Sequence, residues 1–108
     1  MNEDRYYEIH AKICKALAHP TRLKLLDSLQ AGEKSVNELS NELGISRGTV
    51  SRHLNYMRPW GVVFPRRDGQ TIFYRLGSPK IIAAYGIMHE FAIEFLEERG
   101  KLLQMVNR

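Results

Sequence analysis

The chain has 108 residues, a formal net charge of +4 and a sequence pI of about 9.4. This length fits one small domain (residues 1–108) with a limited core, so burial of further surface in a dimer would add stability. No apolar run approaches the roughly 18 residues that span a bilayer, so no membrane partner is expected. The mild basic bias is compatible with nucleic acid as a partner.

The start of the chain and its cysteine content indicate the compartment. The first ten residues are acidic and polar, unlike a secretory signal. Cys14 is the only cysteine, which excludes an intrachain disulfide and a Cys-rich zinc site. We therefore expect a cytoplasmic protein.

Two helices are predicted before the first strong turn signal. Apolar residues recur at helical spacing within residues 1–18. Pro20 suits the start of a second helix, which runs from Thr21 to about Gln30 and is ended by Gly32. The apolar residues of this second helix are Leu23, Leu26 and Leu29.

A helix-turn-helix is predicted over residues 35–58. Ser35 and Glu38 have the spacing of a capping box, which opens the first of the two helices. Gly44 supplies the turn, and Ser46 caps the second helix. The predicted buried stripe of that second helix is Val50, Leu54 and Met57.

A hairpin and a long helix follow. Residues 62–67 and 70–76 have the composition of strands, and Asp68-Gly69 between them is a two-residue turn signal because glycine accepts positive φ. Pro65 suits an edge strand. Residues 79–106 form the last predicted helix. Its apolar stripe consists of Ile81, Ile82, Tyr85, Met88, Ala92, Phe95, Leu96, Leu102, Leu103 and Val106.

The second helix of the helix-turn-helix carries side chains suited to DNA. A helix of this width fits the major groove, where arginine clamps guanine or phosphate and small hydroxyl groups allow close approach. The first backbone N–H groups of a helix also suit a phosphate. The alternative is a solvated polar face. The candidate DNA-binding residues here are Ser46, Arg47, Thr49, Ser51, Arg52, His53 and Asn55.

The hairpin adds basic and polar side chains next to this helix. A wing tip of this kind contacts the neighbouring minor groove or the DNA backbone. The alternative is a charged edge that prevents sheet aggregation, and the same charges can serve both roles. The candidates are Arg66, Arg67 and Gln70. Trp60 packs under the wing or lines an aromatic ligand pocket; the other members of that pocket would be Phe64, Phe73 and Tyr74.

Taken together, these motifs resemble the ArsR/SmtB family of bacterial and archaeal repressors. The residues that carry the resemblance are Ala18-His19-Pro20-Thr21-Arg22-Leu23, Leu39-Ser40-x-x-Leu43-Gly44-Ile45-Ser46, Val50-Ser51-Arg52-His53-Leu54, Arg66-Arg67-Asp68-Gly69-Gln70 and Tyr74. The resemblance implies a mainly α (α+β) fold, a winged helix-turn-helix with a two-stranded wing (62–76) and flanking N- and C-terminal dimerisation helices (1–18 and 79–106). It also implies a homodimer on an inverted-repeat operator, released by an inducer that is often a metal ion.

The sensing motifs of the best-known members are missing. Their third helix carries a Cys-Val-Cys-Asp-Leu box, and Ser35 and Asn37 stand where this chain would need the two thiols. Without thiolates a soft-metal site there is not expected. The last helix has His89 and Glu90 but lacks the Asp-x-His pair of the family's other common site. A two-cysteine redox switch within the chain is excluded, so the inducer is unknown.

One metal or redox constellation remains open. His10 and Cys14 are four residues apart on the first helix and share a face. Across a dimer, His89 of the last helix could join them in a site for zinc, nickel, copper or haem. A Cys14–Cys14 bridge between chains is a further alternative. The simpler interpretation makes Cys14 a small interface residue with His10 at the rim.

The sequence therefore predicts a homodimeric repressor that binds duplex DNA at a palindromic operator, without a cofactor. One rival is a sensor of the same fold that uses His10 and Cys14. Another is a winged-helix module for protein assembly that does not bind DNA. An enzyme is not expected, because no nucleophile–base set or phosphate-cradling glycine loop is present.

Overall fold

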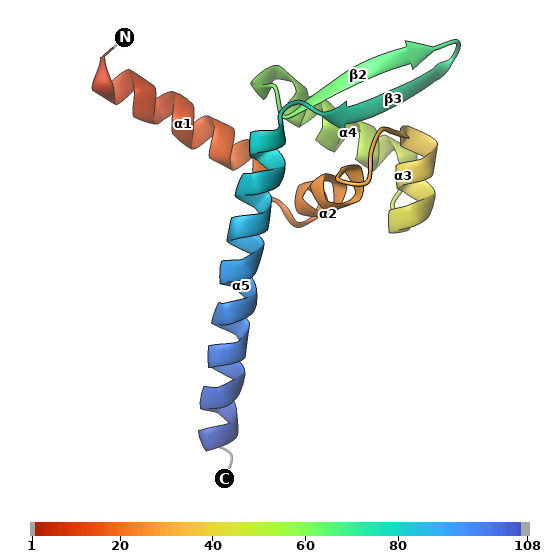
Figure 1. Cartoon of the computed structure of the whole chain (residues 1–108). Coiled ribbons are helices and arrows are strands. Elements are labelled where there is room, and N and C mark those ends of the chain that lie inside the picture. Colours follow the sequence, from red (N-terminus) through yellow and green to blue (C-terminus); the bar gives the residue numbers. More distant parts are fainter. Residues whose placement is uncertain (1, 107–108) are drawn as a thin grey trace.

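The computed structural model describes residues 2–106, and it confirms a winged helix-turn-helix with a helix on either side. Figure 1 shows α2, α3, α4 and the sheet gathered in one body, from which α1 and α5 project in different directions. The elements are α1 Glu3–Leu17, α2 Pro20–Leu29, β1 Lys34–Ser35, α3 Val36–Leu43, α4 Arg47–Met57, the 3-10 turn η1 Arg58–Trp60, β2 Val63–Asp68, β3 Thr71–Leu76 and α5 Pro79–Val106.

Local hydrogen bonds set the geometry of the helix-turn-helix. The Ser35 hydroxyl accepts from the Glu38 backbone N–H at 3.0 Å, and the Glu38 carboxylate accepts from the Ser35 backbone N–H at 3.2 Å. This is the predicted capping box. Gly44 ends α3 with φ of 66°. The Ser46 hydroxyl then accepts from the Thr49 backbone N–H at 3.2 Å and starts α4. These local hydrogen bonds, together with Gly44, fix where α3 begins, where it ends and where α4 begins.

The core lies between α2, α3, α4 and the sheet. As predicted, Val50, Leu54 and Met57 form the fully buried face of α4. On α2 the predicted stripe was partly wrong, because Leu23 is 43% exposed and Leu25 takes the buried position. The buried cluster comprises Leu25, Leu26, Leu29, Leu39, Val50, Leu54, Met57, Val62, Val63 and Tyr74.

The sheet has three strands, in the order β1-β3-β2, so the prediction of two strands was incomplete. Lys34 and Ser35 pair with Tyr74 and Phe73 of β3. A two-residue strand carries no periodic signal, which is why the sequence pattern did not reveal it. The wing itself is the β2–β3 hairpin, and β2 is its edge strand, as Pro65 suggested.

The predicted hairpin turn was off by one residue. Asp68 pairs with Thr71, so the loop consists of Gly69 and Gln70 instead of Asp68 and Gly69. Gly69 has φ of 62°, and no non-glycine residue in the described part of the chain has positive φ. A type II′ turn meets both conditions, because it requires positive φ only at its first central position.

The flanking helices leave most of their apolar side chains uncovered. In α1 only Ala16 is buried, and no residue with a described side chain in α5 is. The radius of gyration is 16.9 Å, against about 13 Å for a compact domain of about 100 residues. The side chains of Leu102, Leu103 and Val106 lie outside the described residues. Exposed large apolar residues of the two helices include Tyr6, Tyr7, Ile13, Ile87, Met88, Phe91, Phe95 and Leu96.

No helix within residues 2–106 is both long enough and apolar enough to cross a bilayer.

A matched pair on α2 tests the assignment of the core. Leu26 is 1% exposed and Leu23 is 43% exposed, on the same helix. We expect Leu26→Ala to lower the free energy of unfolding by about 3 kcal/mol, because it leaves a cavity. Leu23→Ala should cost less than about 1 kcal/mol. Urea unfolding of both variants measures the difference, and equal costs would contradict the assignment.

Candidate nucleic-acid interface

The outward face of α4 carries most of the predicted DNA-binding side chains. Because Val50, Leu54 and Met57 point into the core, the residues on the opposite side of the helix face away from the core. Arg47 and Arg52 are exposed there. The Arg52 guanidinium donates to the Thr49 hydroxyl oxygen at 3.1 Å. This contact lies at the surface and within α4, so the Arg52 guanidinium stays available to a partner.

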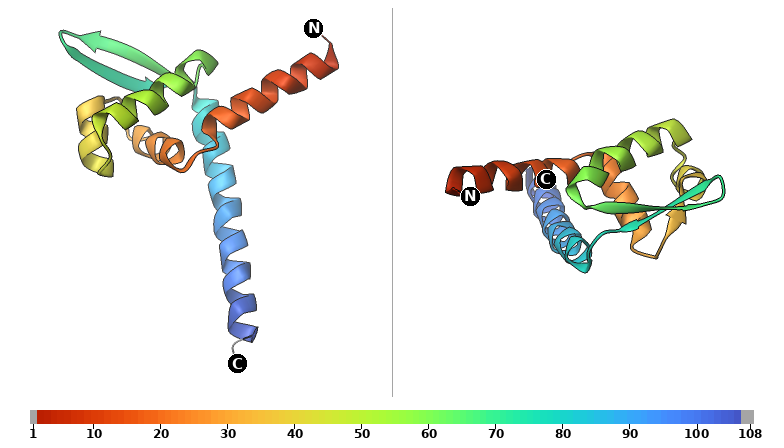
Figure 2. Two further views of the ribbon diagram at one scale, coloured as in Figure 1. Left: turned by 180° about the vertical axis from the view of Figure 1, so that it is seen from behind. Right: turned by 90° about the horizontal axis from the view of Figure 1, so that it is seen from above.

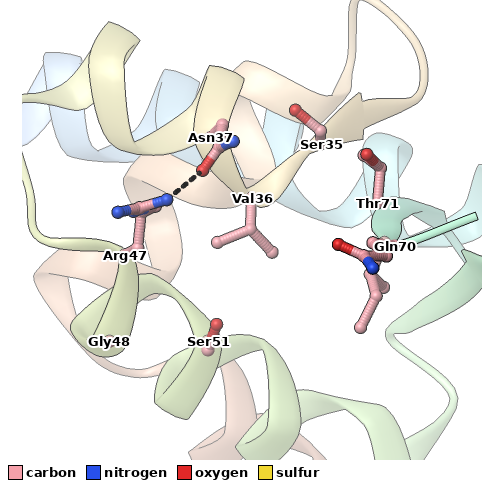
Figure 3. Close-up of a pocket in the computed structure, with 9 residues that line it drawn as sticks. Ser35, Val36, Asn37, Arg47, Gly48, Ser51, Gln70 and Thr71 are labelled. Atoms are coloured by element: carbon pink, nitrogen blue, oxygen red, sulfur yellow. Dashed lines mark hydrogen bonds between the residues drawn. The ribbon is translucent and has the colours of Figure 1, made fainter.

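A groove joins this face to the tip of the wing. It has a volume of about 410 Å³ and lies between the first turn of α3, the first turn of α4 and the β2–β3 loop. Figure 3 shows Arg47 and Ser51 on one side of the groove and Gln70 on the other. The Arg47 guanidinium donates to the Asn37 side-chain oxygen at 3.2 Å across its upper edge. Three predicted site residues from two separate elements therefore meet at one concave surface.

The two wing arginines have different roles in the structure. Arg66 forms a bidentate pair with Glu33: Nη2 lies 2.6 Å and Nε 3.0 Å from Oε1 of that carboxylate. The Arg66 guanidinium also lies 4.8 Å from the Phe73 ring centroid. Arg67 points to the opposite face of the strand and makes no side-chain hydrogen bond within the described residues. The Arg67 guanidinium thus stays available to a partner, while Arg66 ties the wing to the loop before β1 through its hydrogen bonds to Glu33.

The pairing with Arg66 lowers the pKa of the Glu33 carboxyl group. The hydrogen bond from Arg66 lowers the pKa of Glu33 below its ordinary value of 4.5, and the charges of Arg66 and Arg75 act in the same direction.

His53 lies away from the outward face of α4, whereas Asn55 lies four residues after Ser51 on the same side of the helix. The His53 ring is partly buried, with Nδ1 3.2 Å from Nη1 of Arg22 on α2. Asn55 is exposed near the end of the helix, and its side-chain oxygen accepts a long hydrogen bond of 3.5 Å from the Tyr74 hydroxyl. The structure therefore groups Ser46, Arg47, Thr49, Ser51, Arg52 and Asn55 on the exposed part of α4, and separates His53 from them.

A second groove of about 580 Å³ lies between α1 and the end of α4. Trp60 lines it together with Lys12, Lys15, Asn55, Tyr56 and Pro59. The aromatic pocket considered from the sequence does not form. Tyr74 is buried on the core face of the wing, whereas its strand neighbour Phe73 and the cross-strand Phe64 lie on the other face.

The metal-site candidates are not brought together in one chain. His10 and Cys14 are exposed on α1, and His89 lies on α5 with its ring stacked 5.8 Å from that of Tyr85. No group of three His, Cys, Asp or Glu residues in the described ranges is arranged to hold a metal ion. A site at these residues would need a second chain and stays a prediction.

The Glu33–Arg66 tether gives a direct test of the wing geometry. We expect Arg66→Ala to raise the pKa of the Glu33 carboxyl group towards 4.5, because the donor that stabilises the charged form is lost. Arg67→Ala is the matched control, since it removes an equal charge from the opposite face of the strand. NMR titration of the Glu33 side chain measures both, and equal shifts would contradict the pairing.

Comparison with known proteins identifies the family to which the chain belongs. The model for the bacterial regulatory protein, arsR family, matches residues 19–63. The uncharacterized HTH-type transcriptional regulator Rv0081 of Mycobacterium tuberculosis is 31% identical over 105 residues, which cover 96% of this chain and 92% of the relative. The biofilm growth-associated repressor of Xylella fastidiosa is 44% identical over 78 residues, 72% of this chain and 68% of the repressor.

Solved structures agree with the sequence matches. The solution structure of the homodimeric winged helix-turn-helix DNA-binding domain Mb0332 from Mycobacterium bovis superposes with a TM-score of 0.80 at 28% identity, covering 91% of this chain and 93% of that one. The crystal structure of Rv0081 gives 0.78 at 32% identity, covering 87% and 95%. The sequence matches span the helix-turn-helix, the wing and both flanking helices, and on these grounds the chain belongs to the ArsR family of HTH-type transcriptional regulators.

Proposed function

We propose that this regulator is a repressor that binds a palindromic operator in duplex DNA as a homodimer. The observation that carries the proposal is the outward face of α4, where two exposed arginines and three small hydroxyl side chains lie next to a groove that ends at the wing tip. The family is one of transcriptional regulators, which supports regulation of genes over catalysis, and a regulator that binds chromosomal DNA in a bacterium would act in the cytoplasm.

The two arginines and the hydroxyl groups have complementary tasks in a major groove. Arg47 and Arg52 can reach guanine edges or phosphates, while Thr49 and Ser51 let the helix approach closely. The capped start of α4 at Ser46 presents backbone N–H groups to a phosphate. At the wing, the exposed Arg67 and Gln70 side chains are available to contact the adjacent DNA backbone or minor groove.

The flanking helices supply the reason for a dimer. The apolar side chains of α1 and α5 are uncovered in the single chain, and such a surface is unfavourable in water. The similar Mb0332 domain is described as homodimeric. Pairing through these helices would place two copies of α4 for successive major grooves, about one helical turn apart.

The α4 assignment is tested with the Arg47→Ala/Arg52→Ala double variant. We expect its affinity for the DNA upstream of its own coding sequence to fall by about tenfold or more, because two groove contacts are lost. If the arginines contact phosphates, the dependence of affinity on salt should also flatten.

Lys101→Ala is the control for loss of charge, because Lys101 is exposed and lies near the C-terminal end of α5. Figure 1 shows that this end of α5 projects away from α4 and the wing. Fluorescence anisotropy across a salt series measures all three proteins. Wild-type affinity in the double variant would refute the assignment, and absence of salt-sensitive binding in the wild type would favour a protein-assembly module.

A further inference from the structure

Arg22 is a buried cation that joins three helices. Its side chain belongs to α2 and is 8% exposed. One guanidinium nitrogen donates to the Lys15 carbonyl in the last turn of α1 at 3.2 Å, and the other lies 3.2 Å from Nδ1 of His53 on α4. The guanidinium carbon is 4.2 Å from the centroid of the Tyr56 ring, also on α4. Figure 2 shows from two further sides that α1 and α4 meet α2 at this junction.

The setting of Arg22 is unusual because no carboxylate balances its charge. Among the described residues it makes no salt bridge, and its buried Nε has no hydrogen-bond partner. The partial negative charge of the α1 C-terminus and the face of the Tyr56 ring compensate only in part. A buried charge without a counter-ion lowers stability, so its specific contacts point to a role in positioning.

The contact with His53 depends on the protonation state of the imidazole. Nδ1 can accept from Arg22 only when the ring is neutral and carries its proton on Nε2. The charged or titratable groups that face this ring are basic: His19 before α2, Arg22 on α2 and Arg52 on α4. The His19 ring centroid lies 4.4 Å away, and its Nδ1 accepts from the Thr21 backbone N–H.

We propose that Arg22 and neutral His53 form a latch that holds the DNA-reading helix α4 against α1 and α2, and that proton uptake by His53 opens this latch and weakens DNA binding. The inference rests on the proposed function for its effect on DNA, but the latch itself is defined by contacts within the chain. Arg22 is thus a positioning residue, and it links the helix proposed for dimerisation to the helix proposed for DNA contact.

A fall in pH therefore favours loss of the contact between Arg22 and His53. Burial, and then the charges of His19, Arg22 and Arg52, lower the pKa of His53 from its ordinary value of 6.5. As the pH falls below 6.5, the unfolded chain takes up this proton before the folded chain does. The free energy of unfolding must then decrease through this range.

The sign of the pH effect separates this role from direct DNA contact. If His53 touched a phosphate, protonation would add a charge-assisted hydrogen bond and strengthen binding at low pH. If His53 must stay neutral to accept from Arg22, protonation weakens binding. The two roles predict opposite slopes.

The test compares wild type with His53→Asn, whose side-chain oxygen can still accept from Arg22 but cannot titrate. Affinity for the upstream duplex is measured from about pH 7.5 to about pH 5.5 at constant salt. We expect the wild type to lose about fivefold or more relative to His53→Asn over this range. His89→Asn, an exposed histidine of α5, is the control and should follow the wild type. Equal pH profiles for wild type and His53→Asn, or wild-type binding that strengthens with acid, would overturn the proposal.

A second measurement needs no DNA. Urea unfolding of the same three proteins should show stability falling more steeply below about pH 6.5 in wild type and His89→Asn than in His53→Asn. Equal slopes in all three proteins would overturn the latch. If the slopes differ as expected but no protein binds DNA at any pH, the proposed function fails, and with it the effect of the latch on DNA.

Discussion

The buried face of α4 is the constraint on which the rest of the structure depends. Val50, Leu54 and Met57 are fully removed from solvent, so the rotation of this helix about its own axis is set by the core. Every polar residue at intermediate positions is then forced outward or against α2. The capping bonds at Ser35 and Ser46 fix where α3 and α4 begin, and the left-handed Gly44 ends α3 and turns the chain towards α4. The surface proposed for DNA follows from packing and caps.

The same small core covers the flanking helices only where they join it: Leu17 of α1 and Ile81 and Tyr85 of α5 pack against it. On α5, Glu90, Glu94, Glu97 and Glu98 share one side, while apolar residues occupy most of the remaining circumference. An apolar arc that wide calls for more than one helix packed against it, which a single α1 from the same chain does not supply. A second chain, contributing its own α1 and α5, would cover it. The proposed dimer would therefore bury this surface and would also space the two helices proposed for DNA contact.

The sequence was most informative where structure is local. Three predicted features each depend on residues within one or two helical turns, and the structure confirms each of them. They are the capping box of Ser35 and Glu38, the turn at Gly44 and the buried apolar stripe of α4. The hairpin was found, but its turn was displaced by one residue, because Asp-Gly marks a turn without fixing which residue closes it.

Contacts between distant residues were not visible in the sequence. Glu33 and Arg66 are 33 positions apart, and Arg22 and His53 are 31 apart, so no helical or strand period relates them. Both contacts change the interpretation of a predicted site residue: Arg66 becomes a tether, and His53 faces inward. A charged or polar side chain on a predicted DNA-binding element can equally well face its own fold. Only the three-dimensional pairing distinguishes the two.

In the function proposed above, two copies of α4 bind the two halves of one palindromic site. Hydroxyl-radical footprinting of the upstream duplex with the wild-type chain tests it most directly. We predict two protected half-sites whose centres are separated by about one helical turn, roughly 10 base pairs, with weaker protection where the wings reach the flanking DNA. A single protected half-site, or no protection at concentrations where the chain is dimeric, would contradict the account.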